Sequence, residues 1–142
     1  MSMEWTARYV GLPYRQHGRD RSGVDCWGLA RLPLAEIKGV NLPLWDTVGP
    51  ENSVVLGEAV DAGRHDGSWL SVPPAEAREF DFVRMRAPVE IDGRLRWRPI
   101  HIGLVAPRGQ VLHIQRGQTS QLDDIDSLRN RITEFCRHRG LS

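Results

Sequence analysis

The segment that follows Asp25 is rich in apolar residues and stays so until Gly39. Aspartate is a favoured N-cap residue and glycine commonly follows the last turn, so the pattern predicts a helix between these two residues. Pro33 lies inside it. Because an interior proline removes a backbone hydrogen bond, we expect the helix to bend after about two turns. The apolar positions are Trp27, Leu29, Ala30, Leu32, Leu34 and Ile37.

Other parts of the chain carry weaker helical patterns. Residues 4–10 favour a short N-terminal helix, and the glycines and charges of 15–23 indicate a loop. The segment 41–74 has little periodicity and allows one helix over 53–62. A final amphipathic helix over 124–137 is predicted to close the chain. Its apolar positions are Ile125, Leu128, Ile132, Phe135 and Cys136.

Strand-type residues dominate from Phe80 onward. They form runs over 80–85, 100–106 and 111–115. The pair Asp92-Gly93 is typical of a tight turn. We therefore predict strands at these three runs, with a short hairpin between the last two.

The residues Pro107-Arg108-Gly109 suit a three-residue hairpin connection, with glycine where a left-handed backbone is needed. Such a connection pairs Ala106 with Gln110, and this pair fixes the register of the two strands. His101 and His113 then share a face as diagonal neighbours, with Cα atoms roughly 7–8 Å apart and imidazoles within hydrogen-bonding reach. A two-residue loop would instead put them on opposite faces. The other face should meet the core through Ile102, Leu104, Leu112 and Ile114.

Composition limits the class of protein. The chain has 142 residues, of which 40% are hydrophobic and 26% charged, so we expect one globular domain over 1–142. The formal net charge of +1 predicts no general attraction to nucleic acid, and polyanion binding would need a local patch. No stretch approaches the ~20 apolar residues of a membrane span. The N-terminus also lacks a signal-peptide pattern, so we expect synthesis in the cytoplasm without one.

Cys26 is the first candidate for chemistry. It opens the predicted helix, where unpaired N–H groups and the helix dipole favour negative charge, so its pKa is expected to fall. A thiolate beside an imidazolium is the usual form of a cysteine nucleophile, and nearby backbone N–H groups can hold an oxyanion. Position alone leaves alternatives open. Cys26 could be a buried structural cysteine, and His101 and His113 could be two unrelated histidines on a half-exposed strand.

The residues around Cys26 resemble the signature of the NlpC/P60 family of cell-wall peptidases. In that signature a Gly-x-Pro-Tyr segment leads into Asp-Cys-Ser-Gly-Leu. Later strands carry Gly-Asp-Leu-Val, then His-Val-Gly, then a third catalytic polar residue. The resemblance covers residues 7–115 in the same order. The matching segments are Tyr9-Val10-Gly11-Leu12-Pro13-Tyr14, Gly18, Gly23-Val24-Asp25-Cys26-Trp27-Gly28-Leu29, Phe80-Asp81-Phe82-Val83, Ile100-His101-Ile102-Gly103-Leu104-Val105 and Leu112-His113.

This resemblance implies a papain-like α+β fold, with the cysteine-bearing helix packed on a central antiparallel β-sheet. It implies that Cys26 is the nucleophile, that His101 takes its proton and returns one to the leaving amine, and that His113 orients His101. Tyr14 matches a family tyrosine whose hydroxyl lies near the nucleophile, and Asp25 would be a structural partner of the site. No cofactor is implied. A zinc site formed by the cysteine and the two histidines would lack the close ligand pairs of structural zinc, so we expect no metal.

The resemblance also implies a substrate. The family typically cuts peptidoglycan stem peptides between D-glutamyl and diaminopimelyl or lysyl residues. The chain departs from the family pattern at Trp27, where Ser is most common, and at Phe80, where Gly is usual. We expect Trp27 either to change the packing under the cleft or to form an aromatic wall.

The Asp-Cys-Trp-Gly form, the lack of a signal peptide and the ending over 131–138 resemble the phage-tail and gene-transfer-agent branch of the family. This implies a protein that is carried on a tail or virion, with tail proteins as partners, and that digests the wall locally during DNA delivery. Two alternatives remain: an inactive tail-assembly or adaptor protein that retains the fold, and a related thiol amidase or acyltransferase.

The remaining candidate residues are expected to be structural. Cys136 should be a core thiol on a helix face. His17, His65 and His138 should be loop or surface residues. Buried packing is expected for most of the other tryptophans, which are Trp5, Trp45, Trp69 and Trp97.

Overall fold

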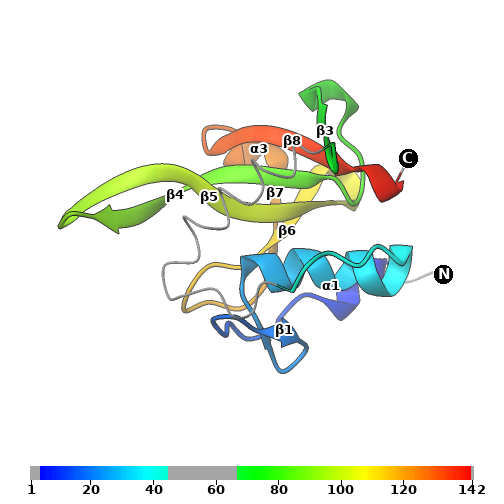
Figure 1. Cartoon of the computed structure of the whole chain (residues 1–142), viewed down its shortest axis with the longest axis horizontal. Helices are drawn as coiled ribbons and strands as arrows, with labels where there is room; N and C mark the ends of the chain where they lie inside the picture. Colours follow the sequence, from blue (N-terminus) through cyan, green and yellow to red (C-terminus); the bar gives the residue numbers. More distant parts are fainter. Residues whose placement is uncertain (1–3, 45–66, 142) are drawn as a thin grey trace.

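The computed structural model describes residues 4–44 and 67–141. In these residues a 13-residue helix lies against one face of a six-stranded sheet (Figure 1). The sheet order is β3-β8-β4-β5-β6-β7, and every neighbouring pair is antiparallel. The predicted α+β class, with one helix packed on a large antiparallel sheet, is therefore confirmed.

The elements have the following bounds. The strands are β1 (Arg19–Asp20), β2 (Gly23–Val24), β3 (Trp69–Val72), β4 (Phe82–Ile91), β5 (Arg94–Ala106), β6 (Gln110–His113), β7 (Gln121–Asp124) and β8 (Ile132–His138). The α-helices are α1 (Cys26–Lys38) and α3 (Ile125–Leu128). Short 3-10 turns are η1 (Trp5–Arg8), η2 (Pro74–Glu76), η3 (Pro107–Gly109) and η4 (Arg139–Leu141).

Helix α1 begins and ends where the sequence predicts. The Asp25 side chain caps it by accepting the Gly28 N–H at 2.9 Å. Gly39 ends it in the left-handed conformation at φ 69°, and its N–H bonds the Leu34 carbonyl. Pro33 does not interrupt the helix, which continues to Lys38. A proline removes a single backbone hydrogen bond, and here the buried neighbours on both sides of it hold the helix against the sheet.

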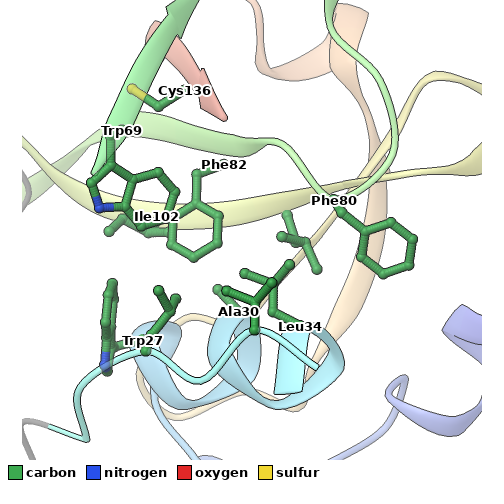
Figure 2. Close-up of a cluster of buried hydrophobic side chains, with 11 residues drawn as sticks. Trp27, Ala30, Leu34, Trp69, Phe80, Phe82, Ile102 and Cys136 are labelled. Atoms are coloured by element: carbon green, nitrogen blue, oxygen red, sulfur yellow. The ribbon is translucent and has the colours of Figure 1, made fainter. Parts of the chain in front are cut away.

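Apolar side chains fill both faces of the sheet. Figure 2 shows the layer between α1 and the sheet, where Trp27, Ala30 and Leu34 of the helix meet Phe82 and Ile102 of the strands. A second cluster joins the same helix to the end of β6 and the segment after it. On the opposite face, strand residues pack against Leu128 of α3. The second cluster contains Tyr9, Val24, Leu29, Leu32, Leu112 and Ile114, and the opposite-face cluster contains Val72, Val83, Met85, Val105, Val111, Leu128 and Phe135.

The β5–β6 hairpin has the predicted register. Ala106 pairs with Gln110, and Leu104 pairs with Leu112. Arg108 and Gly109 both adopt positive φ, at 62° and 69°, as a tight connection requires. The four apolar residues expected on the core face all lie in the two clusters that contact α1.

The β4–β5 hairpin turns at Asp92-Gly93, as predicted, and both of these residues have positive φ. The two strands are longer than the predicted runs and extend as an arm beyond the rest of the sheet (Figure 1). Trp97 on this arm is 55% exposed. Trp69 is buried and Trp5 half-buried, so packing accounts for these two but not for Trp97.

The predicted C-terminal helix over 124–137 is wrong. Only the four residues of α3 are helical, and β8 occupies Ile132–His138. Phe135 and Cys136 are both buried, but they belong to clusters on opposite faces of the sheet. A strand buried on both faces has consecutive apolar residues, and this pattern resembles a short stretch of helix. Cys136 is thus a core thiol, as expected, but on a strand.

Two smaller differences concern the N-terminal part. The predicted loop over 15–23 contains β1 and the start of β2, which form a two-residue ladder. The predicted helix over 4–10 is a single 3-10 turn, η1. The possible helix over 53–62, together with Trp45 and His65, lies outside the described residues.

Gly28 allows the loop before α1 to pack on the first turn of the helix. A Cβ at this position would overlap the backbone carbonyl oxygen of Gly18. We therefore expect Gly28→Ala to lower the free energy of unfolding by about 1–3 kcal/mol, as overpacking does, measured by urea denaturation. The sign of the change in unfolding free energy is informative, because replacing glycine by alanine inside a helix otherwise stabilises a protein by up to about 1 kcal/mol.

Ala35→Gly in the same helix serves as the control for propensity, and it should cost about 1 kcal/mol. If Gly28→Ala instead stabilised the protein, close packing of the loop on the helix would be contradicted.

Candidate active site

The start of α1 is fixed by the Asp25 carboxylate, which is 5% exposed. Its Oδ1 accepts the Gly28 N–H and also a hydrogen bond from Arg19 Nη1 at 2.7 Å. Its Oδ2 accepts the His17 N–H at 3.0 Å. One buried group thus joins the helix to the preceding loop. Asp25 stands where a structural partner of the site was predicted.

The Cys26 sulfur lies at the peptide bond that joins His101 to Ile102. The backbone N–H groups of Ile102 and Trp27 are both directed at it. The β5–β6 pairing stops at Leu104, so the Ile102 N–H lies beyond the last paired residue and is available to the sulfur. The N-terminus of α1 therefore lies where the β5–β6 pairing ends, at the backbone next to His101, the predicted base.

The pKa of Cys26 differs from the prediction. Burial, and to a smaller extent the negative charge of Asp25, raises the pKa of the thiol, which reaches about 12. The hydrogen bonds from Ile102 and Trp27 and the charge of Arg19 lower it, but they do not outweigh burial. The expected depressed pKa is therefore wrong, because desolvation is larger than the effect of the helix start. The sulfur rests as a neutral thiol.

The two predicted histidines are in contact. His101 Nε2 lies 3.0 Å from His113 Nδ1, and both residues are buried. The register of the hairpin had predicted this contact. Nε2 of His101 faces His113, so Nδ1 is the ring nitrogen of His101 that is not directed at His113. The roles of Cys26, His101 and His113 in catalysis stay predictions.

Both imidazoles rest uncharged. Burial, together with the neighbouring His113 and the charge of Arg131, lowers the pKa of His101 to about 3. Burial also lowers the pKa of His113, although a hydrogen bond and the charge of Asp123 oppose this shift. The candidate nucleophile and the two imidazoles thus all rest uncharged.

Asp123 is a further member of the site that the sequence did not indicate. Its Oδ2 lies 2.7 Å from His113 Nε2, and it accepts a hydrogen bond from Gln121 Nε2, also at 2.7 Å. Burial opposes its ionisation, but the hydrogen bonds from His113 and Gln121 outweigh this and hold its pKa below the ordinary value. The β6–β7 ladder pairs Gln121 with His113, and Asp123 is two residues further along the same face.

Tyr14 is near enough to Cys26 for the two groups to interact electrostatically, and its predicted place beside the nucleophile stays a prediction. Burial raises the pKa of its hydroxyl, a hydrogen bond with Arg116 lowers it, and the charges of Asp25 and Cys26 raise it. Tyr14 also forms an isolated bridge with Val24, the residue that precedes Asp25. The bridge fixes the backbone of Tyr14 next to the segment that leads into α1.

The two departures from the family pattern are structural in this fold. Trp27 is 2% exposed, and its indole N–H donates to the Pro43 carbonyl at 2.8 Å, so it packs beneath the site and forms no aromatic wall. Phe80 adopts φ 74°, a conformation that glycine accepts at little cost. Its ring stacks on Trp5 with centroids 4.5 Å apart.

The two other described histidines, His17 and His138, make different contacts. The His17 backbone N–H bonds Asp25, as described above. His138 is half-buried on β8, with its ring edge-on to Trp69, and burial lowers its pKa. Among residues 4–44 and 67–141, no three His, Cys, Asp or Glu side chains are grouped to hold a metal ion. None of the described helices has the length and apolar character to cross a membrane.

The pKa of Cys26 leads to a testable prediction. With a value of about 12 against an ordinary 9.0, the thiolate fraction at pH 8 is about 10³-fold lower than that of a free thiol. We expect iodoacetamide to label Cys26 correspondingly slowly, at a rate that rises with pH and shows no plateau below pH ~10. Peptide mass spectrometry would separate Cys26 from Cys136.

The same protein unfolded in urea provides the control, and its thiols should titrate normally. A plateau in the labelling rate of folded Cys26 below pH ~8.5 would instead reveal a preformed thiolate–imidazolium pair.

Comparison with known proteins places this arrangement among known folds. No family model matches the sequence, and no curated protein matches it. Among solved structures, the NlpC/p60 domain of the peptidoglycan hydrolase SagA has a TM-score of 0.57 and 21% identity, covering 92% of this chain and 90% of that one.

Two further structures are similar. One is an NLP/P60 family protein, similar to a lipoprotein, from Staphylococcus aureus subsp. aureus Mu50, with a TM-score of 0.62, 17% identity and 94% of this chain covered. The other is an NlpC/P60 family protein from Bacillus cereus ATCC 10987, with a TM-score of 0.60, 16% identity and 96% coverage. This chain spans 38% of the length of each of these two proteins. The protein has the fold of NlpC/P60 domains.

Proposed function

We propose that this protein is a cysteine peptidase that hydrolyses the peptide part of peptidoglycan. The observation that supports it most is the placing of the Cys26 sulfur at the His101–Ile102 peptide, with His101 bonded to His113. The fold is shared with structures whose names include a peptidoglycan hydrolase.

In the proposed reaction, Nδ1 of His101 takes the thiol proton as the sulfur attacks the peptide carbonyl. The tetrahedral oxyanion would be held by backbone N–H groups at the start of α1. His101 then returns the proton to the leaving amine, and water hydrolyses the thioester by the same base. Because thiol and imidazole both rest neutral, proton transfer would accompany the attack, and no ion pair is needed beforehand.

We further propose that the bond cut lies between D-glutamyl and a diamino acid in the stem peptide. The support for this is the resemblance of the motifs around Cys26 and His101 to those of NlpC/P60 peptidases.

We also propose that the protein is carried on a phage tail or gene-transfer-agent tail, with tail proteins as partners. The Asp-Cys-Trp-Gly sequence and the segment over 131–138 support this setting. Such a protein would be made in the cytoplasm and act in the cell-wall compartment after delivery.

The proposal is tested by incubating purified protein with defined muropeptides and weighing the products by mass spectrometry. We expect new fragments with free amines, no fragments with Cys26→Ala, and a rate reduced by about 10²-fold with His113→Ala, because an orienting group is lost. Cys136→Ala removes the other thiol and should keep at least a tenth of the activity.

Equal product from the wild type and Cys26→Ala would rule out the peptidase. Binding of muropeptides without cleavage would favour an adaptor, and transfer of the acyl group to an added amine would favour an acyltransferase.

A further inference from the structure

We propose that Asp123 is a positioning residue that fixes the tautomers of both active-site imidazoles and so makes Nδ1 of His101 the base. This inference rests on the proposed function for its consequence in catalysis. Its structural basis is a continuous chain of contacts from Gln121 through Asp123 and His113 to His101.

The Asp123 carboxylate determines the tautomer of His113. An ionised carboxylate can only accept hydrogen bonds, so the 2.7 Å contact requires His113 to carry its proton on Nε2. Gln121 donates to the same oxygen, which holds the carboxylate in place and favours its ionised form. A neutral imidazole has a single N–H, and therefore Nδ1 of His113 is an acceptor.

The second step concerns His101. Nδ1 of His113 lies 3.0 Å from Nε2 of His101, and an acceptor there requires a proton on that Nε2. The lone pair of His101 is then on Nδ1. Of the two ring nitrogens of His101, this is the one not directed at His113. The carboxylate thus determines, through two rings, which nitrogen can accept the thiol proton.

Asp123 also supplies a negative charge near the imidazole that becomes protonated during the reaction. When His101 takes the proton it becomes positive inside a buried site, where its pKa is otherwise low. His113 is neutral and supplies no negative charge to stabilise this cation. The positive charge of Arg131 opposes it, because it lowers the pKa of both histidines. Among the charged groups of the described residues that shift the pKa of His113, Asp123 is the one that favours its protonated form, and His113 in turn contacts His101. It can stabilise the imidazolium as it forms.

The test uses the variant Asp123→Asn and protein with ¹⁵N-labelled histidine. An asparagine amide can donate to His113 Nε2, which would move the His113 proton to Nδ1 and in turn the His101 proton to Nδ1. We therefore expect the two ring nitrogens of each histidine to swap their ¹⁵N chemical shifts: Nδ1 takes the value of a protonated nitrogen and Nε2 that of an unprotonated one. We also expect kcat to fall about 10²–10⁴-fold on muropeptides, with KM changed less than threefold.

Two controls separate this effect from a structural one. Asp124→Asn removes the adjacent, exposed carboxylate and should leave the tautomers and kcat unchanged. Asp123→Glu keeps a carboxylate and should restore the wild-type tautomers.

The wild-type spectrum is decisive even if Asp123→Asn does not fold. His113 protonated on Nδ1 in the wild type would overturn the inference, because an ionised Asp123 can only accept a hydrogen bond from Nε2. The NMR spectra need no turnover. If the protein failed to cleave muropeptides, the proposed function would be contradicted, but the inference about the tautomers would not.

Discussion

The buried carboxylate of Asp25 is the contact on which the position of the candidate nucleophile depends. It caps α1 through Gly28, forms an ion pair with Arg19 and binds the backbone of His17. Arg19 and Asp25 are both largely buried, and breaking such a pair by removing one partner typically costs about 3–5 kcal/mol, because an uncompensated charge remains. The first turn of the helix therefore has little freedom, and Cys26 is held against the strand that carries His101.

The same burial determines the protonation state of the site. Removal from water disfavours charge, so it raises the pKa of Cys26 and lowers that of His101. A helix N-terminus alone would predict a thiolate, but the two N–H groups at the sulfur do not offset the lost hydration. Asp25 contributes to this result, since the charge that anchors the helix also opposes ionisation of the adjacent thiol. Asp25 thus helps to position Cys26 but makes its thiol harder to ionise.

Much of the site could be predicted because local chemistry determines it. The N-cap aspartate and the final glycine define α1, and a three-residue turn defines the β5–β6 register. Once that register is known, the contact between His101 and His113 follows from strand geometry. The pKa values could not be predicted in this way, because they depend on how deeply α1 is buried against the sheet. Burial of this kind is a property of the whole fold.

The C-terminal part could not be predicted, since its sequence fits two structures. Phe135 and Cys136 contact opposite faces of the sheet, and neighbouring apolar residues of this kind also suit a helix. That error concealed Asp123, because a residue at the start of a helix has no expected partner on β6. Only the pairing of β6 with β7 places its carboxylate at His113. A residue that acts through another can thus be found from sequence only after the strand that carries it is assigned correctly, whereas Cys26 and His101 are indicated by their own motifs.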